Sequence, residues 1–117
     1  IWPGFGENMR VMQWIVGRVK GNADAVTSPF GNMPGYEHLN WTGLEFSDGT
    51  FRELMSISRA EAEHEADDQG AFFKKFGSKL PDALEQQRQS FKARLADAPP
   101  VWDTAVAKNG NGKARRA

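Results

Sequence analysis

Residues 2–10, Trp-Pro-Gly-Phe-Gly-Glu-Asn-Met-Arg, place two glycines and two aromatic rings directly before a stretch with helical periodicity. Gly4 and Gly6 flank Phe5, and glycine relaxes the backbone where it must approach a partner closely. Glu7-Asn8 suits a helix start, because such side chains cap free N–H groups and complement the positive end of the helix dipole. The sequence therefore predicts an aromatic loop that leads into an amphipathic helix.

Local signals predict about four helices in the chain. The first continues from the aromatic loop and ends at Gly21-Asn22, as helices commonly do at glycine. Its apolar stripe has helical spacing and consists of Val11, Met12, Ile15, Val16 and Val19. Thr50-x-x-Glu53 and Ser58-x-x-Glu61 match the capping box, which predicts a short helix to Ile57 and a longer helix that Gly77 ends.

The two later helices have expected buried faces. On the longer helix this face consists of Ala62, Ala66, Gln69, Phe73 and Phe76. Leu80-Pro81 opens the last helix, because proline is tolerated in a first turn. Its expected buried face is Leu84, Phe91 and Leu95.

Residues 23–48 break the helical pattern. Ser28-Pro29, Met33-Pro34-Gly35 and further glycines predict turns, while interspersed apolar residues indicate a packed segment rather than a floppy linker. The segment has room for a short strand or two, although no clean alternation predicts where. We therefore expect this chain to be mainly α, with about four helices and a long irregular connection.

The composition changes after Asp97. Ala98-Pro99-Pro100 ends the last predicted helix, Val101-Trp102 can dock locally, and residues 108–117 are rich in Gly, Asn, Lys and Arg. Such a polar stretch favours mobility. The sequence thus predicts an ordered segment at residues 1–97 and a flexible polar, basic tail at residues 98–117.

The balance of charges and the absence of cysteine exclude several classes of function. Lys+Arg and Asp+Glu are equal at 15 each, whereas general nucleic-acid binders usually carry a basic excess. Without cysteine there is no disulfide, thiolate zinc site or cysteine nucleophile. No apolar run approaches the ~20 residues that span a bilayer. We expect neither nucleic acid nor a membrane as a partner, and a cytoplasmic location.

Nothing in the spacing of the polar residues predicts catalytic or metal-binding groups within the chain. His38 and His64 lie in different elements and lack the spacing of zinc motifs, and no serine is placed near either for a triad. The acidic residues around His64 are typical of a solvated helix face. Gly110-Asn111-Gly112-Lys113 superficially resembles a phosphate loop, but it follows no predicted strand and opens no predicted helix.

The opening loop has the chemistry of a site for a flat, polar ligand. Guanine has an acceptor at O6 and donors at N1 and N2, so a selective site needs N–H groups facing O6 and carbonyls facing N1 and N2. A loop that enters a helix offers loose N–H groups and a carbonyl just before them, and Phe5 adds a stacking face. The alternative, from the residues alone, is that Trp2 and Phe5 are core aromatics in a tight turn.

Trp-Pro-Gly-Phe-Gly-Glu-Asn-x-Arg-Val at residues 2–11 resembles the guanine-binding segment of GTP-dependent phosphoenolpyruvate carboxykinases. Similarity to that family continues through Ser28-Pro29-Phe30-Gly31, Pro34, Leu39-x-x-x-Gly43-Leu44 and Leu54-Met55-Ser56-Ile57-Ser58, over roughly positions 1–95. The resemblance implies that Phe5 packs on guanine and that its backbone and Asn8 meet the base edge. It also implies that Gly4 and Gly6 permit the approach, with Glu7 in the same binding loop.

The resemblance further implies what the whole protein is and does. The segment is expected to belong to a larger mixed α/β nucleotide-binding C-terminal domain, with the upstream part of the same enzyme as its partner. That enzyme would convert oxaloacetate and GTP to phosphoenolpyruvate, GDP and CO₂ in gluconeogenesis, as a monomer. Its Mn²⁺ or Mg²⁺ ligands, phosphate loop and other catalytic residues would lie outside this segment. Because the chain starts at Ile1, inside the motif, we expect a cut N-terminus and no activity from the isolated chain.

Some positions depart from the family pattern. Phe30 stands where the family usually has an aliphatic residue, and Asn32 where it often has Tyr. The aromatics that complete the family's guanine sandwich would lie upstream of Ile1.

A second class of function fits the same residues. The alternative is a free-standing, mainly helical protein-interaction module, with Trp2, Phe5 and Trp14 on its binding surface. Nucleotide would have no effect on such a module.

Overall fold

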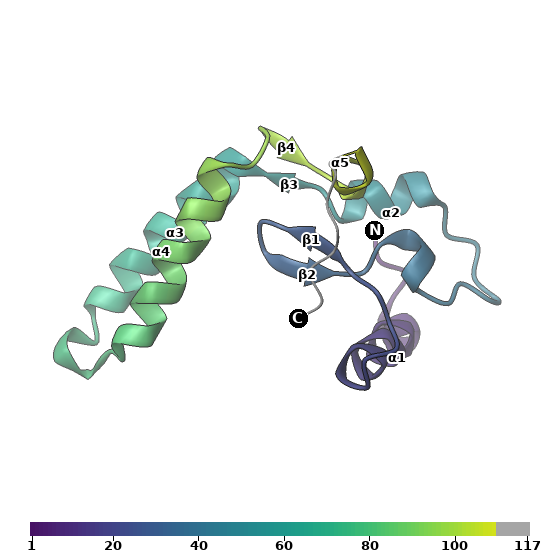
Figure 1. Cartoon of the computed structure of the whole chain (residues 1–117), viewed down its shortest axis with the longest axis horizontal. Coiled ribbons are helices and arrows are strands. Elements are labelled where there is room, and N and C mark those ends of the chain that lie inside the picture. Colours follow the sequence, from purple (N-terminus) through teal and green to yellow (C-terminus); the bar gives the residue numbers. More distant parts are fainter. Residues whose placement is uncertain (110–117) are drawn as a thin grey trace. The chain divides into compact units, whose positions relative to one another are not determined.

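The computed structural model describes residues 1–109 and shows a mainly α protein, as the sequence predicts. In the described part of the chain, five α-helices occur together with 3-10 turns and two antiparallel sheets of two strands each (Figure 1). These elements form two compact units: Ile1–Ser56 with the described residues from Asp103 onward, and Ile57–Trp102. Within the described range, no helix combines the length and the apolar character that a membrane crossing requires.

The described residues of the first unit form three α-helices, one β-hairpin and two 3-10 helices. In chain order these are η1 (Phe5–Glu7), α1 (Asn8–Val19), β1 (Val26–Ser28), β2 (Gly31–Met33), η2 (Tyr36–His38), α2 (Asp48–Leu54) and α5 (Thr104–Asn109). The hairpin pairs Val26 with Met33 and Ser28 with Gly31. The irregular connection thus contains the two short strands for which the sequence left room.

The hairpin turn is built by one buried serine. The Ser28 hydroxyl accepts a hydrogen bond from the amide of Phe30 at 3.0 Å and donates to the carbonyl of Gly31 at 2.9 Å. Gly31 has φ +115°, a conformation that favours glycine. The turn predicted from Ser28-Pro29 is therefore present, and its bonds are local.

An aromatic cluster of Trp2, Tyr36, Trp41, Phe46 and Phe51 forms the centre of the first unit. The ring of Trp41 is stacked between Tyr36, at 5.0 Å, and Phe46, at 5.2 Å between centroids. Phe51 meets Tyr36 and Trp41 edge to face and is only 1% exposed. Two hydrogen bonds hold the stack, from the Tyr36 hydroxyl to the Phe46 carbonyl and from the Trp41 indole to the Tyr36 carbonyl.

Helix α1 is amphipathic as predicted, but its apolar stripe is not buried. The helix contains no buried residue, and Met12, Ile15, Val16 and Val19 are all exposed. The turn after it contains Gly21 at φ +77°, in agreement with the predicted end. Trp14 ties the helix to the following loop through a hydrogen bond from its indole to the carbonyl of Asp24.

The predicted start of the short helix is wrong by three residues. The N-cap of α2 is Ser47, whose hydroxyl accepts a hydrogen bond from the amide of Thr50 at 3.1 Å. Thr50 was expected to be the cap and is instead the third residue of the helix. Ser47-x-x-Thr50 lacks the acidic residue of a capping box, which is why the sequence pattern favoured the later position.

Asp103 directly precedes α5 and links it to α2. Its carboxylate accepts a hydrogen bond from the amide of Ala105 at 2.7 Å and pairs with the guanidinium of Arg52 at 3.1 Å. Burial opposes the charge, but these two contacts outweigh it and lower the pKa of Asp103 below its ordinary value.

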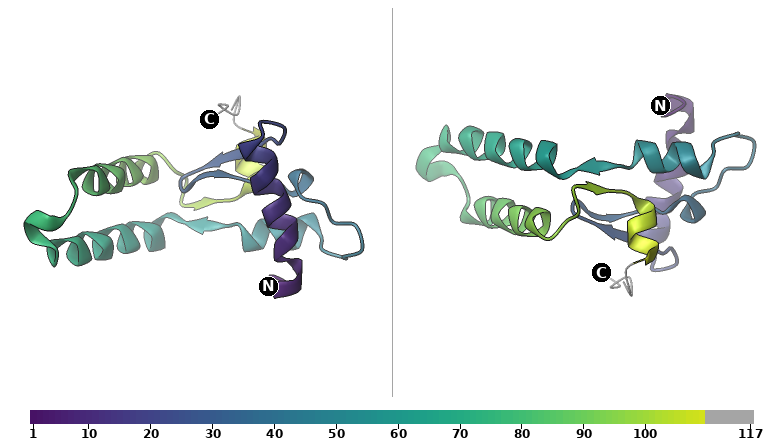
Figure 2. Two further views of the ribbon diagram at one scale, coloured as in Figure 1. Left: turned by 90° about the horizontal axis from the view of Figure 1, so that it is seen from below. Right: turned by 90° about the horizontal axis from the view of Figure 1, so that it is seen from above.

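The second unit is a helical hairpin closed at its base by two short strands. Its elements are β3 (Ile57–Ser58), α3 (Arg59–Lys74), η3 (Gly77–Lys79), α4 (Asp82–Ala96) and β4 (Val101–Trp102). Figure 2 shows α3 and α4 running side by side in opposite directions. Ser58 is the N-cap of α3 and accepts from the amide of Glu61 at 3.4 Å, so the predicted start of this helix is confirmed.

Buried apolar residues and one arginine join the two helices of the hairpin. Ala62 and Ala66 of α3 and Leu95 of α4 are buried. The guanidinium of Arg88 crosses to α3 and donates to the carbonyl of Ala66 at 2.9 Å. It also binds the carboxylate of Glu85 at 2.7 Å on its own helix.

Three residues expected to be buried in this unit are exposed: Gln69, Phe76 and Leu84. Leu84 is 47% exposed and Phe76 is 46% exposed. These two lie near the tip of the hairpin, where α3 has ended and η3 leads into the first turn of α4. Helical spacing identified the correct face of each helix, but the partner helix does not extend far enough to cover this end.

The residues after Asp97 contain two regular elements. Val101–Trp102 pairs with Ile57–Ser58 as β4, and Trp102 is buried, so the expected local docking of this dipeptide is confirmed. Helix α5 then includes Thr104, which is only 2% exposed. The part of the expected tail at 110–117 lies outside the described residues. The boundary at Asp97 stays a prediction.

Replacing the buried ring of Phe51 should strongly destabilise the first unit. We expect Phe51→Ala to lower the free energy of unfolding by about 3–5 kcal/mol, because it leaves a cavity beside Tyr36 and Trp41. Phe5→Ala is the matched control, since Phe5 is 90% exposed, and it should change stability by less than ~0.5 kcal/mol. Urea unfolding followed by tryptophan fluorescence measures both. Equal effects would contradict the assignment of Phe51 to the core.

Acid should weaken the helical hairpin through Glu85. The hydrogen bond from Arg88, with a second from Gln89, lowers the pKa of Glu85 from 4.5 to about 2. A depressed pKa stabilises the folded state above pH 4.5, and this contribution is lost as the pH falls from 4.5 towards 2. Glu85→Gln should therefore flatten the loss of stability across this window.

Circular dichroism melts at several pH values test this expectation. In an Arg88→Gln background the same substitution at Glu85 should change the pH profile much less, because the main cause of the shift has been removed. An unchanged profile in the Glu85→Gln single variant would show that the pair does not contribute to acid sensitivity.

Candidate functional site

The opening loop enters α1 through a 3-10 turn that depends on Gly4. Gly4 has φ 116° and ψ 174°, a region that is essentially restricted to glycine. Its carbonyl accepts the amide of Glu7 at 3.1 Å, and the carbonyl of Phe5 accepts the amide of Asn8. These two bonds make a continuous helical entry. They also use one acceptor site on the carbonyl of Gly4 and one on the carbonyl of Phe5.

Phe5 and Trp2 differ in their surroundings, although the sequence suggested one role for both. The side chain of Phe5 is 90% exposed. Trp2 is half-buried and meets Trp41 and Phe46 edge to face, at 6.3 and 6.0 Å between centroids. The interpretation as core aromatics therefore describes Trp2 but not Phe5, whose ring faces are available to a ligand.

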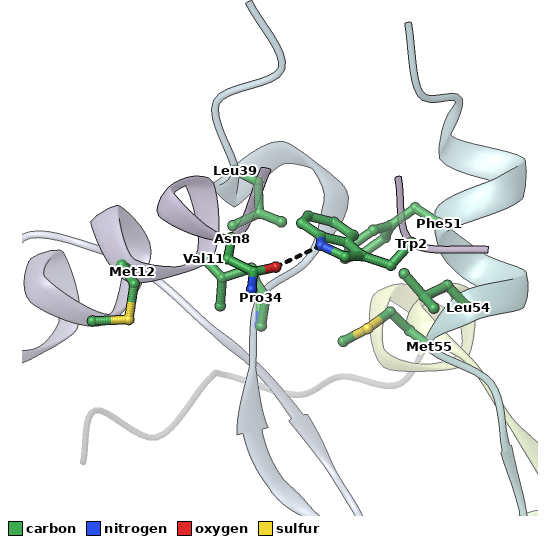
Figure 3. Close-up of a pocket in the computed structure, with 9 residues that line it drawn as sticks. All are labelled: Trp2, Asn8, Val11, Met12, Pro34, Leu39, Phe51, Leu54 and Met55. Atoms are coloured by element: carbon green, nitrogen blue, oxygen red, sulfur yellow. Dashed lines mark hydrogen bonds between the residues drawn. The ribbon is translucent and has the colours of Figure 1, made fainter. Parts of the chain in front are cut away.

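Asn8 is held by Trp2. The indole Nε1 of Trp2 donates a hydrogen bond of 2.8 Å to Oδ1 of Asn8 (Figure 3). An indole N–H is a donor only, so the atom of the amide that faces it must be the oxygen. The amide nitrogen of Asn8 is thereby turned away from Trp2. The sequence placed Asn8 in the site but did not predict this contact.

Glu7 has a structural partner at the same helix start. Its carboxylate accepts a hydrogen bond from Nε of Arg10 at 2.6 Å, and Nη1 of Arg10 donates to the carbonyl of Asn40 at 2.6 Å. The Arg10 side chain is 17% exposed. Arg10 therefore links α1 to the loop that contains Asn40, and Glu7 holds the Arg10 side chain.

A largely apolar cavity lies beside Asn8. Its volume is about 520 Å³, and Trp2 and Asn8 form part of its wall (Figure 3). The remaining lining residues are Val11, Met12, Pro34, Leu39, Phe51, Leu54 and Met55. No pattern in the sequence predicted this cavity. The apolar stripe of α1 was the available signal, since Val11 and Met12 belong to it.

The exposed ring of Phe5, the amide of Asn8 and the first N–H groups of the helical entry lie on neighbouring residues. A helix start leaves its first amides without intrahelical acceptors. Together these groups offer a stacking face and several hydrogen-bond donors, with few formal charges. Such an arrangement suits a planar heterocycle that has an acceptor on its edge.

The two histidines of the chain take part in local contacts. Nδ1 of His38 accepts the amide of Gly35 at 2.9 Å, and His64 lies 3.5 Å from Asp68 one turn along α3. Across residues 1–109, no three His, Asp or Glu side chains come together in a way that would hold a metal ion.

Comparison with known proteins identifies a family model and relatives that match most of this chain. Residues 1–94 match the family model described as the phosphoenolpyruvate carboxykinase C-terminal P-loop domain. The chain is 36% identical over 96 residues to phosphoenolpyruvate carboxykinase (GTP) of Arthrobacter sp. strain FB24, covering 82% of this chain. It is 37% identical over 94 residues, or 80% of this chain, to the protein of that name from Renibacterium salmoninarum. It is 36% identical over 101 residues, or 86% of this chain, to that of Anaeromyxobacter dehalogenans strain 2CP-1.

The matches cover a small part of each relative. The chain spans 16% of the length of the first two relatives and 17% of the third.

The two glycines of the loop should respond differently to alanine. Gly4→Ala should cost about 1–3 kcal/mol, because the backbone conformation of Gly4 disfavours a side chain. Gly6 lacks a positive φ, and an added Cβ would meet nothing within 4 Å. Gly6→Ala should therefore be neutral or stabilising by up to ~1 kcal/mol. Urea unfolding of the two variants measures this difference, and a destabilising Gly6→Ala would contradict it.

Proposed function

Because this chain belongs to the phosphoenolpyruvate carboxykinase family, we propose that it is the guanine-recognising part of a GTP-dependent phosphoenolpyruvate carboxykinase. The observation that carries this proposal is the exposed ring of Phe5, three residues before the oriented amide of Asn8 at the start of α1. Family membership favours this function over a free-standing interaction module. Such a module would present Trp2 and Trp14 to a partner, yet the indoles of both donate to groups of this chain.

In the proposed complex, Phe5 stacks on guanine and the start of α1 binds its edge. Base–aromatic stacking is worth about 1–3 kcal/mol per base. The backbone of Phe5 and the side chain of Asn8 contact the edge of the base. Stacking alone accepts any base, so selectivity for guanine comes from the edge contacts.

The other residues of the loop support this arrangement. Gly4 supplies the backbone conformation that starts the turn. Gly6 leaves space around the loop, since no atom outside its two chain neighbours lies within 4 Å of the position of an added Cβ. Glu7 acts through Arg10, which fixes the helix start from which Asn8 extends.

The reaction of the whole enzyme follows from the family to which the chain belongs. We infer that oxaloacetate and GTP become phosphoenolpyruvate, GDP and CO₂, in the direction of gluconeogenesis. The family's Mn²⁺ or Mg²⁺ would stabilise the enolate that decarboxylation leaves. No group of His, Asp and Glu side chains within residues 1–109 is arranged to hold a metal ion. The metal ligands would therefore come from outside this range. The proposal extends to a monomeric, cytoplasmic enzyme.

The proposal is tested on the complete reading frame that contains this chain. Oxaloacetate-dependent formation of phosphoenolpyruvate with Mn²⁺ should proceed with GTP and poorly with ATP. Phe5→Ala should raise KM for GTP by about 5- to 150-fold, the equivalent of one lost stacking contact. Phe30→Ala is the matched control, because Phe30 is also exposed but lies in the hairpin turn, and KM should be unchanged.

Two outcomes would contradict the proposal. Absence of turnover with either nucleotide would contradict the carboxykinase function. An unchanged KM for GTP in Phe5→Ala would show that Phe5 does not contact the nucleotide. The 117-residue chain alone should show no turnover, because the phosphate loop and metal ligands are expected elsewhere.

A further inference from the structure

We propose that Trp2 is a positioning residue that selects the purine, by fixing which end of the Asn8 amide faces the base. It holds the amide so that its NH₂ group faces the ligand, which favours a carbonyl at position 6 of the purine over an amino group. This inference rests on the proposed function, in which Asn8 contacts the edge of the base. It adds Trp2, whose side chain packs in the aromatic cluster, to the residues that determine purine selectivity.

Trp2 is itself held in place by that cluster. Its ring meets Trp41 and Phe46 edge to face, at 6.3 and 6.0 Å between centroids. Trp41 in turn is stacked between Tyr36 and Phe46, and its indole donates to the carbonyl of Tyr36 at 2.8 Å. The position of the Trp2 N–H is therefore set by a packed group rather than by a mobile loop side chain.

The contact between Trp2 and Asn8 has only one polarity. The indole Nε1 lies 2.8 Å from Oδ1 of Asn8 and has a hydrogen to donate but no lone pair to accept. A flipped amide would set its NH₂ group against the indole N–H, and two donors would face each other. The flipped state therefore loses a hydrogen bond and gains a repulsive contact.

The amide nitrogen is left for the ligand. Nδ2 of Asn8 has no hydrogen-bond partner among residues 1–109. The backbone of Asn8 is fixed by the hydrogen bond from its amide to the carbonyl of Phe5. With the helix start and the oxygen both held, the NH₂ group is a donor with a defined direction.

This orientation provides selectivity that asparagine lacks on its own. An amide that turns freely offers its NH₂ group to a 6-oxo purine or its oxygen to a 6-amino purine. The Trp2 contact removes the second option. Discrimination between guanine and adenine then depends on Trp2 as well as on Asn8.

The test is Trp2→Phe in the complete enzyme, assayed with GTP, ATP and 2-aminopurine riboside triphosphate. The substitution removes the N–H and keeps an aromatic ring against Trp41 and Phe46. The preference for GTP over ATP in kcat/KM should fall about two- to tenfold, the range expected for one hydrogen bond. The change should appear in KM. The 2-aminopurine nucleotide has no group at position 6, and its kcat/KM should not change.

Two comparisons separate orientation from packing. Trp14→Phe removes an indole hydrogen bond from α1 to the backbone carbonyl of Asp24 in the following loop and does not touch Asn8, so the nucleotide preference should stay at the wild-type value. In an Asn8→Ala background, Trp2→Phe should have no further effect on that preference. Should Trp2→Phe fail to fold, 3-benzothienylalanine at position 2 keeps the shape of tryptophan and lacks the N–H.

The outcomes distinguish the two proposals. A wild-type enzyme that uses neither nucleotide overturns the proposed function. If Asn8→Ala loses the preference for GTP while both replacements of Trp2 keep it, the proposed function stands and the role of Trp2 is overturned. An equal loss of kcat/KM with all three nucleotides also overturns it, because that result would come from packing alone.

Discussion

The stacking of Trp41 between Tyr36 and Phe46 is the interaction on which the first unit depends. It joins the 3-10 helix η2 to the loop before α2, and Phe51 of α2 closes it from the edge. Trp2 packs against the same group, so the position of the opening loop follows from the cluster. Five aromatic side chains provide this centre in a unit whose first helix buries no residue. Aromatic rings bury large areas and pack with defined geometry, which suits a small core.

The proposed base site draws on this core without being part of it. Phe5 projects from the loop with 90% of its surface exposed, while Trp2, three positions earlier, is packed. Asn8 connects the packed residue to the exposed site. Its side-chain oxygen accepts the hydrogen bond from Trp2, and its amide nitrogen points away from Trp2. A site built in this way is rigid where polarity must be defined and open where a ring must stack. These are the two requirements for selecting one purine over another.

The sequence predicted local features well and distant contacts poorly. Ser58 caps α3 as its pattern indicated, whereas α2 starts at Ser47 without the acidic residue that marks a capping box. Leu84 has the spacing of a buried residue and is exposed, since α3 ends before it can cover the tip of the hairpin. The motif identified Phe5 and Asn8 as neighbours. The donor that orients Asn8 and the apolar cavity beside it were not predicted, because both depend on residues brought together by folding.

Neighbouring residues alone were sufficient for the mainly α class, most helix ends and the glycine-dependent loop. Capping and turn bonds join residues only two to four positions apart, and backbone conformation at Gly4 is a property of one residue. Folding decided which apolar side chains are buried and which way the Asn8 amide points. Those features depend on Trp2 meeting Trp41 and Phe46, and on where the partner of each helix ends. Periodicity describes a face of a helix, but only the packed neighbour determines whether that face is covered.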